Sequence, residues 1–365
     1  MKLYILNESL ERIKPISVYS SITWNTFYKE EGNFTLEIPL YLFKFVVPSE
    51  AEDRFIEYTR DPENVGVIES VEKKTDESGQ KSLVVKGRMC AGLLDRRVSY
   101  GDNSFEDKYP RSIIKSLLED NFLSPNDPLR QISLISYTET DQPILEKVDY
   151  DLKRGDEILY TIKELCKITD FGFSMGLNSD ATKLRLKIYK GVDRTASQST
   201  VVPFIIQQRR GIVTVMEYYK DDTNYKNYAE VDKENKVRTY YPKTNQKAGL
   251  RRRETFYDMS STSQTIQKAD GTEIKIADVY YENMIINDTI AKLIEALPTE
   301  YIDSELNRQL VKQFRNSIYL GDLITVKDDE SGFSMDTQIS GATEVESKEG
   351  YQIQLQLGTN NVSYG

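Results

Sequence analysis

Apolar and polar residues alternate along the first hundred residues of the chain. The run from Phe34 to Ile38 places an apolar side chain at every second position, as in a strand with one buried face. Residues 65–71 and 83–88 are apolar runs separated by a polar stretch that ends at Gly79, and this spacing predicts a hairpin. We therefore expect this part of the chain to be β.

Between residues 101 and 199 the apolar pattern changes to a helical period. After Pro110, apolar residues recur on one helical face as far as Phe122, and proline suits a first helical turn. A second apolar stripe runs from Ile158 to Cys166, and strict alternation resumes at residues 184–188. Helices and strands in one stretch predict an α+β unit.

The remainder of the chain repeats this change of pattern. Residues 200–280 return to short strand patterns between polar, turn-rich stretches. Residues 283–314 carry two apolar stripes at helical spacing, interrupted by Pro298, and predict a helical segment. Residues 351–357 alternate strictly, so the last fifty residues are expected to be β. The order β, α, β, α, β is compatible with a duplicated plan of a barrel and an insertion.

The composition excludes most common enzyme designs, because the 365 residues include no histidine. Ser-His-Asp and Cys-His triads, HExxH zinc sites and other His-containing metal sites all require that residue. The phosphate-binding patterns GxxxxGK[ST] and GxGxxG are also absent from the sequence. We therefore expect no catalytic residue, no cofactor and no metal.

The cysteines indicate a protein with free, reduced thiols, and the charge argues against a general nucleic-acid-binding surface. The formal net charge is −10, whereas nucleic-acid-binding proteins usually carry a basic stripe. The basic clusters Arg209–Arg210 and Arg251–Arg253 are short, and we expect them to serve subunit or partner contacts. Cys90 and Cys166 lie among apolar neighbours and are interpreted as buried free thiols. We expect no membrane helix and no secretion signal.

One segment matches a catalytic motif by its letters. Residues 172–176 read Gly-Phe-Ser-Met-Gly, which fits the GxSxG nucleophile elbow. An elbow needs a strand before the serine, a helix after it and a base. Here the pattern predicts a helix before Ser174 and a strand after it, and no histidine can serve as base. Gly172 is interpreted as the C′ residue of the preceding helix.

Three pairs of adjacent carboxylates leave one enzymatic alternative open. They are Glu30–Glu31, Asp221–Asp222 and Asp328–Asp329. Glycoside hydrolases use two carboxyl groups that face each other across a cleft. Adjacent carboxylates in polar stretches more often mark solvated turns, so this alternative ranks second.

A set of short segments occurs in a fixed order along nearly the whole chain. The segments are Trp24–Phe27, Glu31–Pro39, Leu83–Arg88, Asp149–Gly155, Asn227–Val231, Ile318–Val326 and Gln352–Gly358. In this order they resemble phage tail hub proteins of the siphophage Gp37-like family and the related gp27-like baseplate hubs. The residues that carry the resemblance, which it implies to be structural, are Trp24, Phe27, Gly32, Phe34, Gly87, Arg88, Leu320, Gly321 and Asp322.

The resemblance implies a mostly β chain of the α+β class, in which two β-barrel domains carry α/β and helical insertions. The first barrel would span residues 1–100 and be completed by about 200–225, with an α+β insertion at 101–199. The second barrel would comprise 226–282 and 315–365, with a helical insertion at 283–314. We expect separate buried sets in the two barrels, because alternation places each set on one face. These sets are Trp24, Phe34 and Leu36, and Leu323, Val326, Leu355 and Leu357.

The resemblance also implies a function without chemistry. The chain would form a homotrimeric ring that continues the tail tube at the tip of a phage or prophage tail, assembled in the bacterial cytoplasm. The implied partners are the distal tail protein and tail tube, the tape-measure protein, and a tail fibre or receptor-binding protein. DNA would pass through without specific binding, and no stable membrane insertion is implied. The alternative is a tail-borne cell-wall hydrolase that uses paired carboxylates.

Overall fold

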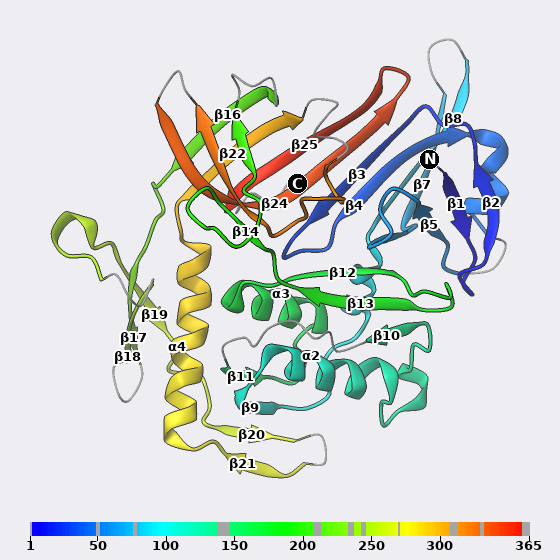
Figure 1. The fold of residues 1–365 in the computed structure, drawn as a ribbon. Helices are drawn as coiled ribbons and strands as arrows, with labels where there is room; N and C mark the ends of the chain where they lie inside the picture. The colour runs from blue at the N-terminus through cyan, green and yellow to red at the C-terminus, as the bar shows by residue number, and fades with distance from the viewer. Residues whose placement is uncertain are drawn as a thin grey trace.

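The structure is a computed structural model that describes residues 2–48, 52–75, 79–137, 147–207, 213–232, 237–241, 246–268, 271–306, 313–328 and 332–359. Strands dominate it, and an eleven-stranded sheet runs diagonally across the upper part of the molecule (Figure 1). Eight strands follow the order β16-β22-β25-β24-β3-β4-β8-β7, and β14, β15 and β23 are attached through β24. Their bounds are β3 (Ser21–Phe27), β4 (Asn33–Pro39), β7 (Ser70–Thr75), β8 (Lys81–Arg88), β14 (Asp193–Arg194), β15 (Ile205–Gln207), β16 (Val213–Asp221), β22 (Thr299–Leu306), β23 (Leu323–Asp328), β24 (Phe333–Ser347) and β25 (Gly350–Thr359).

One end of this sheet packs against a second, four-stranded sheet. That sheet has the order β2-β1-β5-β6, with β1 (Leu3–Leu6), β2 (Arg12–Ile16), β5 (Phe55–Tyr58) and β6 (Val65–Val67), and the short η1 (Leu40–Leu42) and α1 (Phe43–Val46) lie beside it. Trp24, Phe34 and Leu36 are buried in the core between the two sheets. Their predicted burial is confirmed, and the predicted hairpin is β7 paired with β8.

A separate core lies at the other end of the large sheet. Val326, Leu355 and Leu357 are fully buried there, as predicted. The prediction for Leu323 is wrong, because that side chain is exposed. Side chains of a strand alternate between its faces, and since Ile324 and Val326 point into the core, Leu323 points away from it.

The two cores share one continuous sheet, and β24 is the strand that joins them. Its residues 333–338 pair with β23, and its residues 341–347 pair with β3, with an irregularity in its pairing with β25 between Ile339 and Gly341. The Phe34 strand and the Leu323 strand therefore belong to one sheet, separated by β3 and β24. Within the described residues no closed barrel forms, so the predicted separation into two barrels is not confirmed.

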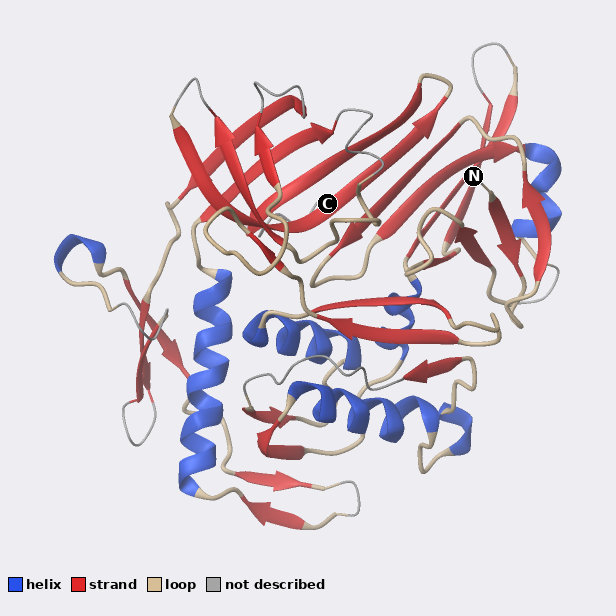
Figure 2. Cartoon of the chain, in the orientation of Figure 1, coloured by secondary structure: helices blue, strands red, loops and turns tan. Residues whose placement is uncertain are grey.

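An α+β unit lies below the large sheet (Figure 2). Its main helices are α2 (Pro110–Leu118) and α3 (Ile158–Thr169), and the short η2 (Cys90–Arg96), η3 (Glu119–Leu123) and η4 (Pro128–Arg130) accompany them. Its strands are β9 (Asn103–Lys108), β10 (Ile135–Tyr137), β11 (Val148–Leu152), β12 (Gly172–Leu177) and β13 (Leu184–Tyr189). The predicted helical stripes face a common core, and both predicted helices are confirmed.

The predicted helical segment at 283–314 is only partly helical. Helix α4 (Asp278–Glu295) covers its first half. Residues Thr299–Leu306 form strand β22 between β16 and β25, so the prediction of a second helix is wrong there. Pairing on both sides satisfies the backbone of this strand, and tertiary context of this kind outweighs local spacing. Leu310 and Val311 lie outside the described residues.

A small unit, called the arm here, comprises residues 225–258 and lies on the outer side of α4 (Figure 1). It is a three-stranded sheet of β17 (Tyr228–Asp232), β18 (Val237–Tyr240) and β19 (Glu254–Asp258), with the one-turn helix η6 (Gly249–Arg251). The hairpin of β20 (Thr265–Gln267) and β21 (Glu273–Lys275) follows. Val231, Ile266 and Ile285 share a core that joins the arm, the hairpin and α4.

Candidate functional site

One of the predicted signature residues, Trp24, contacts a buried polar junction between the two cores. Trp24 on β3 packs against the tilted rings of Phe34 and Tyr58, at ring centroid distances of 5.6 and 5.2 Å. Its indole Nε1 donates a hydrogen bond of 2.9 Å to Oδ2 of Asp61. A buried tryptophan requires such a partner for its N–H group, and here the partner is a carboxylate.

Asp61 belongs to an ionic junction that consists of Asp61, Arg315 and Glu344. Both carboxylates are about 1% exposed. Arg315 forms an ion pair with Asp61 and contacts Oε1 of Glu344 through Nη2 at 2.5 Å and Nε at 3.1 Å. Asn64 donates to Asp61 at 2.9 Å, and the Tyr351 hydroxyl donates to Glu344. The junction thus connects the β5–β6 loop, β24, β25 and the loop before β23.

The charges of this junction are removed from water, and each one is stabilised by the opposite charge beside it. Burial raises the pKa of Asp61, and the nearby Arg315 charge opposes that rise. For Arg315, burial alone would lower the pKa, but the carboxylates of Asp61 and Glu344 outweigh it and the pKa is raised. The guanidinium therefore remains charged, and removing it would leave two buried carboxylates without their counter-charge.

A second polar cluster is built on the signature turn Leu320–Asp322. Asp322 is buried and accepts hydrogen bonds from Val192 N, Arg194 Nε and Tyr319 N at 2.8, 2.8 and 3.1 Å. Leu320 is buried in the second core. Gly321 has φ of +89°, and a Cβ there would lie 2.3 Å from the Tyr28 ring, so both conformation and space require glycine.

Tyr28, at the end of β3, connects this turn to the α+β unit. Its hydroxyl donates to the Asp170 carbonyl at 3.1 Å and accepts from Gly191 N at 3.2 Å. Its ring packs edge-on against Tyr189, with centroids 5.5 Å apart. Because Tyr28 is also part of the second core, these contacts tie the α+β unit to that core.

The remaining signature residues serve close contacts between strands. A Cβ at Gly87 would lie 1.7 Å from the Val67 carbonyl oxygen, and one at Gly32 would lie 2.0 Å from that of Asn25. Phe27 packs against Gly341. Arg88 bridges Glu69 and Asp95 at 2.7 and 2.6 Å. Each of the nine signature residues thus packs against or bonds to a neighbouring segment of the described chain.

No pattern in the sequence indicated Asp61 or Arg315, because both lie outside helices and strands. The burial of Glu344 could have been predicted from the sequence. The alternation along β24 places it on the same face as buried Ala342, and an acidic residue on an apolar face needs a buried partner.

The GxSxG segment is a buried strand. Gly172 and Ser174 both lie in β12, and the C-cap of α3 is Asp170, which takes the left-handed conformation with φ of +56°. The interpretation of Gly172 as the C′ residue is therefore wrong. Its lack of a side chain makes room for Tyr28, whose ring would lie 2.1 Å from a Cβ there. The Ser174 hydroxyl is buried and has no hydrogen-bond partner in the described part of the chain.

The paired carboxylates serve local contacts at separate places. Glu30 and Glu31 form ion pairs with Lys163 on α3 at 3.3 and 3.1 Å. Asp221 accepts from Thr223 N at 2.8 Å, and Asp222 forms an ion pair with Arg253 at 3.1 Å. Asp328 ends β23, and Asp329 lies outside the described residues.

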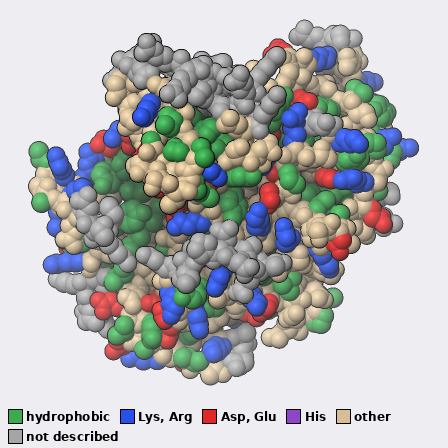
Figure 3. Space-filling view, viewed as in Figure 1, with side chains coloured by type: hydrophobic (Ala, Val, Ile, Leu, Met, Phe, Trp, Pro, Cys, Tyr) green, Lys and Arg blue, Asp and Glu red, His purple; other side chains and the backbone are tan. Residues whose placement is uncertain are grey.

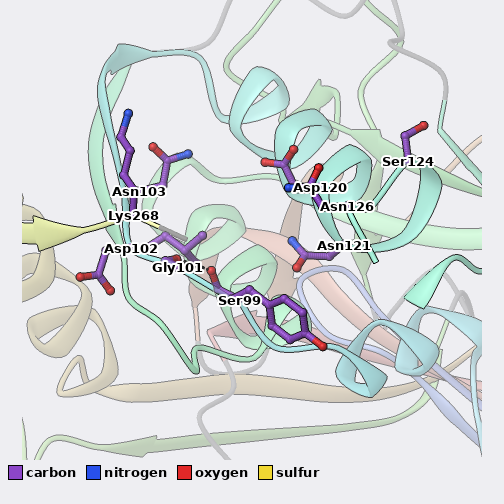
Figure 4. Close-up of a pocket in the computed structure, with 11 residues that line it drawn as sticks. Ser99, Gly101, Asp102, Asn103, Asp120, Asn121, Ser124, Asn126 and Lys268 are labelled. Carbon is purple, nitrogen blue, oxygen red and sulfur yellow. Dashed lines mark hydrogen bonds between the residues drawn. The ribbon is translucent and has the colours of Figure 1, made fainter. Parts of the chain in front are cut away.

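A polar pocket of about 280 Å³ lies between the α2 end of the α+β unit and the β20–β21 hairpin. Figure 4 shows Asp102 and Lys268 at one end and Asp120 and Asn121 on the helical wall. Asp102 accepts from Arg154 N at 2.7 Å and from Gln267 N at 2.8 Å. Burial raises the pKa of Asp120. Since Asp102 already bonds two backbone N–H groups, it connects the hairpin to the unit.

The other predicted features are placed as follows. Cys90 and Cys166 are buried free thiols, as predicted, and burial raises the pKa of both. Arg252 and Arg253 contact Glu254 and Asp222 of the same chain, whereas Arg209 and Arg210 lie outside the described residues. Among the described residues, no group of His, Cys, Asp and Glu has the arrangement of a metal site, and no helix has the length and apolarity to cross a membrane.

A protein-family model and several solved structures are similar to this chain. The model of a family described as "Siphovirus ReqiPepy6 Gp37-like protein" matches residues 2–359. No curated protein matches the sequence. Similar solved structures include the tail protein from Neisseria meningitidis MC58, at 14% identity and a TM-score of 0.57, covering 99% of this chain and 96% of that one.

Two prophage tail proteins have the same fold at similarly low identity. Prophage tail protein gp18 from Listeria monocytogenes EGD-e has 11% identity and a TM-score of 0.55, with 100% of this chain and 96% of that chain covered. The 43 kDa tail protein of prophage MuSo2 from Shewanella oneidensis has 9% identity and a TM-score of 0.54, with 98% of each chain covered. The shared fold therefore extends over whole chains.

Proposed function

Because the chain belongs to the Siphovirus ReqiPepy6 Gp37-like family, we propose that it is a structural hub at the tip of a phage or phage-like tail, working as a homotrimeric ring. The family match and the tail-protein folds of similar solved structures support a role in the tail. The contacts of the signature residues with neighbouring segments are those expected of a structural role, which supports a function without catalysis. The ring would continue the tail tube and anchor the tip components.

The observation that best supports a ring is the continuous sheet with two open ends. Within the described residues, β16 pairs only with β22 and β7 pairs only with β8. A strand at the end of a sheet presents unpaired N–H and C=O groups that invite pairing with another chain. Two different edges on one chain suit a head-to-tail contact, and such contacts generate closed rings when the rotation closes.

The shared sheet also supports a rigid ring wall. Two cores under one sheet, joined by the buried ionic junction, resist rotation of one core relative to the other. We propose that the distal tail protein and tail tube, the tape-measure protein and a tail fibre or receptor-binding protein contact such a ring. DNA would pass through its centre without specific binding. Mass spectrometry of purified tails tests this location.

The ring is tested by the mass in solution and by engineered cross-links. Sedimentation should give about three times the chain mass of 42.1 kDa. Because both natural cysteines are buried, the double variant Lys73→Cys and Tyr219→Cys places the only accessible thiols on β7 and β16. Oxidation should give covalent dimers and trimers on a non-reducing gel, whereas each single variant should not give trimers. A 42 kDa species at all concentrations, within tails or free, would contradict the ring.

A further inference from the structure

The arm differs in charge from the rest of the chain. Residues 225–258 include nine Lys and Arg and five Asp and Glu, a formal charge of +4. The whole chain carries −10, so the remainder carries −14. Figure 3 shows Lys and Arg side chains gathered over the arm at the left edge of the molecule. A basic unit thus extends from an acidic body.

Side-chain contacts fix the shape of this basic unit. Asn227 is buried, donates to the Arg251 carbonyl at 2.8 Å and accepts from Arg253 N at 2.8 Å. The Arg252 guanidinium lies 3.7 Å from the centroid of the Tyr228 ring, which packs against Tyr240 at 4.8 Å. These contacts order the loop before the arm meets any partner, which lowers the entropy cost of binding.

The ordered loop presents apolar side chains to the outside. Leu250, in the middle of η6, is fully exposed, and Phe256 on β19 is 58% exposed. Arg251, next to Leu250, is also exposed. An exposed aliphatic side chain on a pre-ordered loop, flanked by cationic groups, fits a partner surface that offers an apolar pocket with an acidic rim.

We propose that the arm binds the acidic body of an adjacent copy of this chain and so fastens the ring from its outer side. This inference depends on the proposed ring, and it adds the surface that holds neighbouring copies together. Charge selects the occupant, because the remainder of an identical chain carries −14 against the +4 of the arm. The arm and the body are different surfaces of one chain, which is the requirement for a head-to-tail contact.

Two arm variants and two matched controls test this inference. Leu250→Asp removes the apolar anchor, and Arg251→Glu reverses an exposed charge. Leu129→Asp and Arg185→Glu make the same changes at exposed positions of the α+β unit, where Leu129 is 90% exposed. Sedimentation of each protein should show a dissociation constant of the ring raised at least tenfold in each arm variant and unchanged in the controls. Raising the salt from 50 to 500 mM should weaken the wild-type ring, since screening shortens the range of charge attraction.

The outcomes separate the arm from the ring itself. If the wild type and both arm variants form equally stable trimers, the arm inference is overturned and the ring stands. If the wild type is a monomer at all concentrations, both are overturned. If the wild type retards double-stranded DNA on a gel and Arg251→Glu abolishes this while the trimer is unchanged, the arm binds a polyanion and the inference is overturned. Circular dichroism of each variant confirms its fold.

Discussion

Replacing Arg315 by methionine should be among the most damaging single changes in this chain. Methionine keeps a long, flexible side chain at that position but removes the guanidinium. Asp61 and Glu344 are each about 1% exposed. In the variant both carboxylates would stay buried without the cation that neutralises them. Breaking a buried ion pair from one side leaves an uncompensated charge, which the protein can relieve only by protonation or by local opening.

The expected loss is about 3–5 kcal/mol in the free energy of unfolding. With a urea m value of about 3 kcal/mol per molar, this lowers the urea midpoint by about 1–1.7 M. The second replacement Glu344→Gln in the same chain should recover part of the loss, because one of the two unpaired charges is then absent. With the single variant Glu344→Gln and the wild type, these proteins complete a double-mutant cycle, and its interaction energy measures the coupling of the pair.

Trp24 provides the assay, because it is the only tryptophan of the chain and its Nε1 contacts Asp61. Its fluorescence during urea unfolding reports on the junction itself. Arg12→Met is the matched control, since Arg12 also forms a short ion pair, with Glu57 at 2.6 Å, but its side chain is 53% exposed. The control should cost under about 1 kcal/mol. If Arg315→Met costs no more than Arg12→Met, the buried junction contributes nothing to stability and the reasoning fails.

Three further predictions concern single positions. Burial raises the pKa of Asp151 to about 7 and that of Asp288 to about 6 from 3.8, so stability should fall as the pH rises through 6–7; thermal midpoints at pH 5 and pH 8 check this, and Asp151→Asn should reduce the difference. Gly321→Ala should lower the urea midpoint more than Gly332→Ala, because both glycines have positive φ but only Gly321 lacks room for a Cβ; equal effects would refute the steric argument. Ser174→Ala should leave stability unchanged or raise it by up to about 1–3 kcal/mol, since the buried hydroxyl has no partner among the described residues, and reproducible cell-wall hydrolysis lost in this variant would contradict a structural role.

The spacing of apolar residues was sufficient to predict the type of each element that buries one face in a single core. The stripe after Pro110 and the stripe from Ile158 to Cys166 became α2 and α3, and the alternation around Phe34 became β4. In each case the period of the apolar side chains matches the period of the helix or strand that forms. The signature residues were predicted from a resemblance and not from periodicity, and their structural role in the family stays a prediction.

Prediction failed where partners distant in sequence decide the structure. Residues 299–306 became a strand because β16 and β25 lie on either side, and nothing within those eight residues records these neighbours. The continuity of the large sheet was missed for the same reason, because β24 joins two cores that each look complete locally. Arg315 was missed because the charges that make it important, Asp61 and Glu344, lie far away along the chain.

The shared strand β24 also sets when this chain can fold. Gly341 pairs with Phe27, and the two are separated by 314 positions, the difference of their numbers. During synthesis, one edge of β3 therefore stays unpaired until nearly the whole polypeptide has left the ribosome. Unpaired strand edges favour aggregation. Pairings of this sequence separation are slow to form. A nascent chain interrupted before β24 therefore lacks the strand that joins its two cores.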